Sequence, residues 1–403
     1  MVQKHTILDW LGQHVFVGLD VHKRSWIVAI VTEQTDFKMF TQPPDVKLLV
    51  SYLHRHFPNA TCHCVYEAGY CGYWICDELR ALGIDCIVIN PADVPTMDKE
   101  RKHKTNKVDA RKLARSLRNG ELVPLYVPSR IALEDRTLVR SRHMLVSKQT
   151  RCKNQIKALL SFYGITLPED IADRYWSARY VAWLEALSLQ SPGGTHTLKT
   201  LLQELAHLRK SILDTTRAIS ALARTASYAL NVLYLTTISG ISTLVAMIFL
   251  TEIVTLERFH SLDHLACFVG LIPGERSSGD ERTMTGMTER KNRYLRWVLT
   301  ESAWVAIRHD ESLALAIQHP QSADAKEPSD HTHCTKTSQS GSLCSQTSTT
   351  VYRLKSSLKL SPPLIRTPII SLDTRGSALF PACGSHFGEI SASWQTAPHN
   401  HSS

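Results

Sequence analysis

The stretch Val15-Phe-Val-Gly-Leu-Asp20 decides the fold, because it is an unbroken apolar run that ends in a carboxylate. Such a run predicts a strand that is buried on both faces. A second apolar run, at residues 26–31, follows after a short turn, so the two runs predict a hairpin. A carboxylate at the tip of a buried strand is costly unless it is paired. We therefore expect Asp20 either to accept backbone N–H groups in the turn or to bind a cation.

Strand-like and helix-like patterns alternate downstream of this hairpin. The predicted elements are strands at 37–41, 61–66 and 85–89 and helices at 43–53 and 74–82. This order predicts an α/β layer with a partly parallel sheet. The strand at 61–66 also leads into a carboxylate, Glu67. Sites in such sheets lie beyond the carboxyl ends of strands, which is where Asp20 and Glu67 both fall.

A basic block follows the predicted sheet. Between residues 98 and 118, nine Lys or Arg stand against three Asp or Glu. Thr105 or Asn106 can cap a helix here, and Asp109 falls in its first turn, where the helix dipole favours a carboxylate. The apolar stripe of this predicted helix is Val108, Leu113 and Leu117. The density of positive charge favours phosphate contact. The candidate nucleic-acid-binding residues of the block are Lys102, Lys104, Lys107 and Arg111.

Two long helical patterns, at 131–163 and 198–228, flank a looser segment around 190–195. They predict an antiparallel helical arm of the coiled-coil type. The first pattern carries seven Arg or Lys residues, which favours contact between the arm and DNA or RNA. A structural spacer or a dimerisation coil is the alternative.

Residues 230–253 predict a helix, a glycine turn at Ile238–Ser242 and a second helix. A turn that starts a helix directs free N–H groups outward, which suits a backbone phosphate. The turn interrupts the uncharged stretch between Arg224 and Glu252, so neither half approaches the roughly 20 residues that a membrane span requires. We therefore expect two buried helices and no membrane segment.

A pair of serines precedes a predicted basic helix. Ser277 and Ser278 stand beside Gly279 in a segment that predicts a flexible loop. A serine facing several arginines has the parts of a nucleophile directed at a phosphodiester. A capped turn before a basic helix, which is expected from about Glu289, is the alternative. The arginines concerned are Arg276, before the serines, and Arg290, Arg293 and Arg296, which share a helix face.

The composition sets the class of protein. A chain of 403 residues predicts two or three domains, and 43% apolar residues are enough for a real core. The formal charge of +9 fits a polyanionic partner where the charge is clustered. The ten cysteines form no CxxC pair, so we expect reduced thiols in a cytosolic protein. Beyond residue 320, Ser, Thr and Pro dominate, which predicts a disordered tail.

Five motifs in order carry a family resemblance. They are Gly18-Leu-Asp-Val-His-Lys23, Glu67-Ala-Gly69, Lys104-Thr-Asn-Lys-Val-Asp-Ala110, Phe268-Val-Gly-Leu-Ile-Pro273 with Ser277-Ser-Gly279, and Asn292-Arg-Tyr-Leu-Arg296. Over residues 15–318 the chain resembles the DEDD transposases of bacterial insertion sequences, of the insertion sequence 110 type, which are related to Piv- and MooV-like DNA invertases.

The resemblance implies a fold class and a division of the chain. Residues 15–128 would form an α/β RuvC-like domain of the ribonuclease-H fold, after an extension at 1–14. Residues 129–228 would form the coiled-coil arm. Residues 229–318 would form a small, mainly α-helical transposase domain that bears the serine and a helix-hairpin-helix-like turn. Residues 319–403 would be a disordered tail or the product of a shifted reading frame.

The resemblance also implies a mechanism. Asp20, Glu67 and Asp109 would bind Mg²⁺ (or Mn²⁺), with Asn106 at the remaining acidic position. Ser278, or the adjacent Ser277, would attack DNA and form a phosphoserine link. The partners would be the element ends, the target DNA, a guide (bridge) RNA and further copies of the chain in a homodimer or homotetramer. The expected location is the bacterial cytoplasm, in association with the nucleoid.

Three departures from the family pattern bear on activity. Asn106 replaces an Asp and brings no charge. The segment Ser239-Gly-Ile-Ser242 stands where the family has Pro-Gly-Ile-Gly. The family pattern stops near Gln318. Two alternatives therefore stay open: an active copy of the element, and a decayed or truncated one. Two other functions stay open: a structure-selective endonuclease of the junction-resolvase type, and an inactive relic that only binds nucleic acid.

Overall fold

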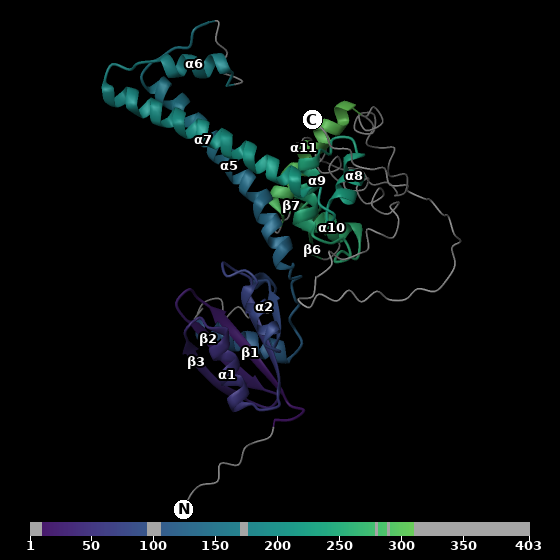
Figure 1. The fold of residues 1–403 in the computed structure, drawn as a ribbon. Helices are drawn as coiled ribbons and strands as arrows, with labels where there is room; N and C mark the ends of the chain where they lie inside the picture. The colour runs from purple at the N-terminus through teal and green to yellow at the C-terminus, as the bar shows by residue number, and fades with distance from the viewer. Residues whose placement is uncertain (1–9, 95–105, 170–175, 279–280, 288–290, 310–403) are drawn as a thin grey trace, which may run out of the picture.

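The computed structural model describes residues 10–94, 106–169, 176–278, 281–287 and 291–309. They form an α/β domain, a long helical arm, and a helical domain at the base of that arm (Figure 1). Within these ranges, no helix has both the length and the apolar character needed to cross a membrane. The predicted tail at 319–403 lies outside the described residues.

The first domain is built on a five-stranded sheet in the order β3-β2-β1-β4-β5. The strands are β1 (His14–Val21), β2 (Trp26–Thr32), β3 (Asp36–Gln42), β4 (Thr61–Glu67) and β5 (Asp85–Ile89). β1, β2 and β3 pair antiparallel, whereas β4 pairs parallel with both β1 and β5. The predicted hairpin and the partly parallel sheet are therefore confirmed.

Alternate residues of β1 face opposite sides of the sheet. Val15, Val17 and Leu19 are buried on the side covered by α1 (Val46–His56) and α2 (Trp74–Ala81). On the other side, Gly18 faces α4 (Asn106–Arg118). Asp20 has the same parity as Gly18, so its carboxylate emerges on the side of α4. Phe57, beyond the end of α1, is fully buried on the side of the sheet that α1 and α2 cover.

The stripe predicted for α4 is confirmed at Leu113 and Leu117, which pack with residues of β4 and β5, but the rest of it differs. Ala110, Leu113 and Ala114 are buried, whereas Val108 is 41% exposed. The two alanines pack against β2. Small side chains allow the helix backbone to approach the sheet closely, and a search for large apolar residues overlooks them.

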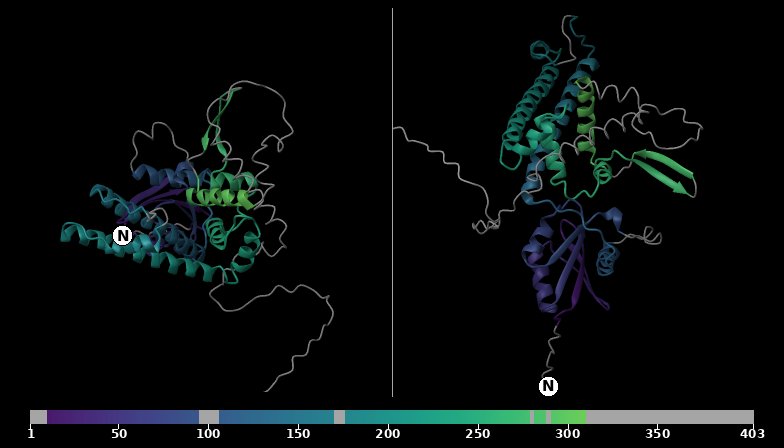
Figure 2. Two further views of the ribbon diagram at one scale, coloured as in Figure 1. Left: turned by 90° about the horizontal axis from the view of Figure 1, so that it is seen from above. Right: turned by 90° about the vertical axis from the view of Figure 1, so that its right-hand side faces the viewer.

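The arm consists of α5 (Arg130–Phe162) and α7 (Pro192–Leu222), which lie side by side, with the short helix α6 (Ala178–Ala186) at the far end (Figures 1 and 2). Their shared core is formed by Cys152, Ile156, Leu160, Leu198, Leu202, Leu205 and Leu208 with residues of α6. α7 begins inside the segment predicted to be loose, because Ser191 caps it by accepting the N–H of Gly194 at 3.0 Å. α6 has no counterpart among the helices predicted from the sequence.

The second domain packs around α9 (Thr243–Ile253), most of which is buried. The other helices are α8 (Ala229–Thr236), α10 (Leu262–Val269) and α11 (Arg293–His309). The predicted pair of helices with a glycine turn is confirmed as α8 and α9. Val139 of α5 and Ile219 of α7 belong to the same core, so the base of the arm is built into this domain.

A two-stranded hairpin, β6 (Pro273–Ser278) and β7 (Glu281–Met287), connects α10 to α11. The prediction of a flexible loop at the serines was therefore wrong, since Ser277 and Ser278 pair with β7. The alternating threonines of β7 are typical of a strand. The hairpin extends away from the helices of the second domain (Figure 2). The predicted basic helix begins at Arg293, later than expected.

Candidate active site

Asp20 and Glu67 occupy matching positions on neighbouring parallel strands. β1 and β4 pair as far as Leu19 and Tyr66, and the two carboxylates are the next residues along. Tyr66 is fully buried among the residues beneath α1 and α2, so Glu67 faces the opposite side of the sheet, toward α4. The sheet register therefore delivers both carboxylates to one edge and one face.

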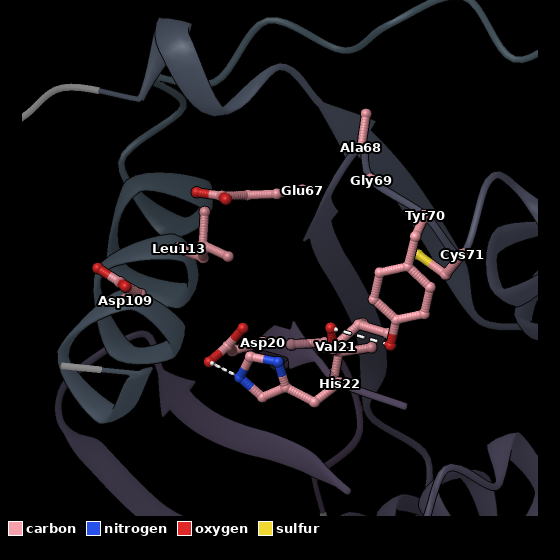
Figure 3. Close-up of a pocket in the computed structure, with 11 residues that line it drawn as sticks. Asp20, Val21, His22, Glu67, Ala68, Gly69, Tyr70, Cys71, Asp109 and Leu113 are labelled. Carbon is pink, nitrogen blue, oxygen red and sulfur yellow. Dashed lines mark hydrogen bonds and ion pairs between the residues drawn. The ribbon is translucent and has the colours of Figure 1, made fainter. Parts of the chain in front are cut away.

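Asp109 of α4 lines the same pocket, but its carboxylate points away from those of Asp20 and Glu67 (Figure 3). A pocket of about 200 Å³ is lined by Asp20, Glu67 and Asp109, together with residues of the β4–α2 turn (Figure 3). The side chains of Asp20 and Glu67 extend from the sheet toward the helix that carries Asp109. The three carboxylates predicted to share a site thus line one cavity.

Gly18 allows α4 to lie at this distance from the sheet. A Cβ at Gly18 would collide with the carbonyl oxygen of Ala110 and lie 2.6 Å from the backbone nitrogen of Ala114. A side chain at this position therefore requires the helix to move. Because Asp109 adjoins Ala110, the glycine also sets the position of the third carboxylate.

His22 and Tyr70 also line the pocket, and the sequence analysis did not select them. His22 Nε2 lies 3.1 Å from Asp20 Oδ2. The Tyr70 hydroxyl donates to the Val21 carbonyl at 3.4 Å, and Lys23 Nζ lies 5.9 Å from the centre of the Tyr70 ring. The signal for His22 was its position two residues after Asp20, in the turn that directly follows β1.

The donors of this pocket suit a hard divalent cation in kind, since carboxylate oxygens are the protein ligands that Mg²⁺ prefers. In the part of the chain that the structure describes, no three His, Cys, Asp or Glu side chains stand close enough to enclose one ion. Mg²⁺ does not need such a cage, because it commonly takes one or two carboxylates and completes its shell with water and substrate phosphate. The pocket therefore fits an open magnesium site.

Several predicted residues lie outside what the structure describes. Lys102, Lys104 and Arg290 are not among the described residues, and the same holds for the side chains of Asn106, Lys107, Arg276, Ser277 and Ser278. Asn106 is the first residue of α4 and Ser278 the last of β6.

Arg111, one of the predicted nucleic-acid-binding residues, faces the protein's own Asp36. Its Nε lies 3.6 Å from Asp36 Oδ2, and Arg115 of the same helix also bonds that carboxylate. The hydrogen bond from Arg115 holds the pKa of Asp36 below its ordinary value, and the charge of Arg111 adds to this effect. The pair of arginines thus ties α4 to the edge strand β3.

Comparison with protein families identifies the family of this chain. Residues 17–165 match the family model for DEDD transposases of the IS110 type, described as "Transposase". Residues 233–318 match a second model, described as "Transposase IS116/IS110/IS902 family". The chain belongs to the DEDD transposases of insertion sequences. The two matches cover the first domain with α5 of the arm, and most of the second domain.

Individual relatives of the transposase carry the same function in their names. The protein named "Putative transposase y4qE" of Sinorhizobium fredii is 29% identical over 72% of this chain and 72% of its own length. The transposase for insertion sequence element IS1111A of Coxiella burnetii is 25% identical over 62% of this chain and 66% of its own length. The transposase for element IS1533 of Leptospira borgpetersenii is 27% identical, over 60% and 70% of the respective chains.

The transposase fixes its arm to the second domain through a buried carboxylate that the sequence analysis missed. Glu252 of α9 accepts hydrogen bonds from Arg140 Nε (2.6 Å) and Nη2 (2.7 Å) and from Asn292 Nδ2 (2.7 Å). Burial alone raises the pKa of Glu252, but the hydrogen bonds and charge of Arg140 outweigh it, and the pKa lies below its ordinary value. Arg136 donates to the Thr251 carbonyl at 2.8 Å. Two of the seven basic residues of the first arm helix therefore bond to the second domain.

An aromatic and basic surface lies where α11 meets α5. The His143 ring lies 4.4 Å from the Tyr294 ring and 5.5 Å from that of Trp297, measured between centroids. Trp297 is 51% exposed. Arg293 is exposed and Arg296 partly exposed on the same helix. Flat rings beside guanidinium groups suit the faces of unpaired bases and the phosphates between them.

Proposed function

We propose that this transposase cleaves and rejoins DNA, with Mg²⁺ (or Mn²⁺) held by Asp20, Glu67 and Asp109 and with Ser278 as the nucleophile. The observation that carries the proposal is the register of β1 and β4, which brings Asp20 and Glu67 to the same face of one sheet edge. Carboxylate oxygens on one face of the sheet are the ligands that a hard divalent cation prefers. A basic chain whose fold lines one pocket with three carboxylates therefore fits a metal-assisted reaction on a polyanion.

The chain's own residues hold this site rigidly. Two of the carboxylates are fixed by paired strands, and the third by a helix that Gly18 allows to lie close to the sheet. His22 contacts Asp20 and can hold its carboxylate in one orientation, as outer residues do for metal ligands. A divalent cation bound there would neutralise charge on the phosphate and on the leaving oxygen.

In the proposed reaction, the Ser278 hydroxyl attacks a phosphodiester of the element. Its O–H bond breaks, a bond forms between Oγ and phosphorus, and the bond from phosphorus to one sugar oxygen breaks. That oxygen leaves as a hydroxyl, with the proton. A hydroxyl of another DNA end then reverses the step, which rejoins the DNA and frees the serine. Arg276, Arg290, Arg293 and Arg296 are proposed to stabilise the negative charge on the phosphate.

The proposal extends to assembly and partners. The carboxylate pocket and the serine hairpin belong to different domains (Figure 1). This separation supports a homodimer or homotetramer in which the pocket of one copy acts with the hairpin of another. DNA and a guide RNA are the proposed polyanionic partners, bound through the basic residues of the segment before α4 and through the exposed surface of α11.

Cleavage and strand-transfer assays test the proposal. The substrate is DNA carrying the element's ends, with the RNA that flanks the gene added. We expect D20A and S278A each to abolish strand transfer, and S277A to retain it as the matched control. A stable protein–DNA adduct should form with wild type and be absent with S278A. Full activity of either D20A or S278A would overturn the assigned roles.

One observation favours a second function, a structure-selective endonuclease. Every lining residue of the pocket comes from the first domain. Such an enzyme would nick branched DNA in a metal-dependent way, would leave no covalent adduct, and would be unaffected by S278A. The same assay therefore separates the two functions. Salt-sensitive binding with no cleavage under Mg²⁺ or Mn²⁺ would instead identify an inactive relic.

A further inference from the structure

Asn292 fastens the chain at the base of the hairpin that bears Ser278. The Asn292 backbone N–H donates to the Phe268 carbonyl at 3.0 Å, which joins the chain after the hairpin to the helix before it. Its Oδ1 accepts the N–H of Leu295 at 3.0 Å and caps α11. Its Nδ2 donates to Glu252. Asn292 thus connects α10, α11 and α9 at the point where the hairpin leaves the domain.

The two ends of the hairpin pass each other closely at the same place. Gly270 has a φ of +87°, and a Cβ there would collide with the side chain of Lys291. The glycine both ends α10 in the left-handed conformation and leaves room for the returning chain. The base of the hairpin is therefore fixed in position by packing as well as by hydrogen bonds.

Glu252 extends this attachment to the arm. Its side chain is 1% exposed and accepts hydrogen bonds from Asn292 and, with both oxygens, from Arg140 of α5. A buried ion pair seldom stabilises a protein more than apolar residues of the same volume would. What it supplies is a fixed arrangement, because only one geometry satisfies all of its donors.

We propose that Asn292 and Glu252 are positioning residues for strand cleavage, which set the place of the Ser278 hairpin relative to α9 and the arm. The inference rests on the proposed function, since it concerns the nucleophile named there. A displacement of about 1 Å can cost a reaction a hundredfold while leaving binding intact. Loss of the contact between Asn292 and Glu252 should therefore slow adduct formation without weakening the affinity for DNA.

The matched variants are N292S and N292A in the full chain. A serine at position 292 can still cap α11, because serine is a preferred N-cap residue, but it is too short to reach Glu252. An alanine can do neither. The first measurement is single-turnover formation of the protein–DNA adduct as a function of the DNA concentration. The second is amide hydrogen exchange across residues 273–287, which needs no activity.

We expect N292S to lower the maximal rate of adduct formation at least about tenfold, with the half-saturating DNA concentration changed less than about twofold. Exchange in the hairpin should be faster than in wild type, to the same extent as in N292A. Wild-type rate and exchange in N292S would show that Asn292 only caps α11 and would overturn the inference. A wild-type protein with no Ser278-dependent adduct would overturn the proposed function, and hairpin exchange would still decide whether Asn292 and Glu252 fix the hairpin.

Discussion

Gly18 of β1 lies against the backbone of Ala110 in α4 so closely that no side chain fits between them. Gly18→Ala should therefore displace the helix and destabilise the protein by about 2 kcal/mol, as overpacking of a filled core does. Urea unfolding measures the loss. Gly69→Ala is the control, since the nearest atom to a Cβ there is 4.0 Å away. Equal free energies of unfolding for the two variants would mean that α4 can move away from β1 without loss of stability.

The carboxylate pocket should bind divalent metal through Asp20 and Glu67. Asp20→Asn and Glu67→Gln keep the shape of each side chain and remove its charge, so each should weaken Mn²⁺ binding at least about tenfold, since charge is what draws a hard cation to carboxylates. Calorimetric titration of the full chain measures this affinity. Asp85→Asn is the control, because Asp85 bonds His63 at 2.9 Å and does not line the pocket. A loss of affinity as large in D85N would point to a general charge effect.

Asn106→Asp should raise the affinity for Mg²⁺. Position 106 opens α4 and stands three residues before Asp109, so the two positions share a helix face. A carboxylate adds the charge that an amide lacks, and the N-terminus of the helix favours it. The measurement is the same titration, with Asn119→Asp at the other end of the helix as the control. Unchanged affinity in N106D would place residue 106 outside the metal shell.

Stability in acid should depend on Glu252. Its pKa in the folded protein lies below the ordinary 4.5, so its contribution is complete above that pH and is lost as the pH falls through the folded value. Glu252→Gln should cost about 2 kcal/mol at pH 7, because it removes charged hydrogen bonds from a buried site. Below pH 4.5, the free energy of unfolding of E252Q should fall less steeply with pH than that of wild type.

Urea unfolding at a series of pH values tests this expectation. Asp214→Asn is the control, since Asp214 pairs with Arg217 at 3.5 Å and both side chains are more than half exposed. An exposed pair of this kind contributes about 0–1 kcal/mol. Parallel pH profiles for E252Q and wild type would contradict the role assigned to the buried carboxylate.

The exposed face of α11 should contribute to nucleic-acid binding in two separable ways. Arg293→Gln and Arg296→Gln should each reduce the salt dependence of binding by about one counterion, because each removes a phosphate contact. Trp297→Ala should weaken binding of single strands by about 1–3 kcal/mol through lost stacking and leave the salt slope unchanged. Fluorescence anisotropy at several salt concentrations measures both. Arg130→Gln, whose partner Glu134 is one turn away on an exposed part of α5, is the control.

The sheet and the helices of the first domain could be read from the sequence because strand-like stretches such as those of β1 and β4 alternate with helical patterns. The apolar part of each strand ended in a carboxylate, Asp20 or Glu67, so their shared edge could be anticipated. The close approach of α4 could not, since it depends on Gly18 and on alanines that carry little hydrophobic signal. Glu252 was missed for another reason: its partner Arg140 is 112 residues away, and no local pattern joins them.

The loop expected at Ser277 and Ser278 shows that a short stretch of sequence cannot predict strand pairing. Gly274 and Gly279 indicate a turn, and the segment reads as irregular when taken alone. The pairing of β6 with β7 depends on both strands together. In the sequence, the strand propensity of the threonines at 283 and 285 was the signal for it. Reading those threonines as a strand would have placed the serine on a hairpin.

α5 serves two separate cores along one uninterrupted helix. Val139 packs into the second domain, and Cys152 packs into the far part of the arm. Each residue of an α-helix advances the side-chain direction by about 100°, so a single insertion between these two positions would rotate one core out of phase with the other. Evolution can therefore lengthen or shorten this helix only in steps that restore the phase, such as three, four or seven residues at a time.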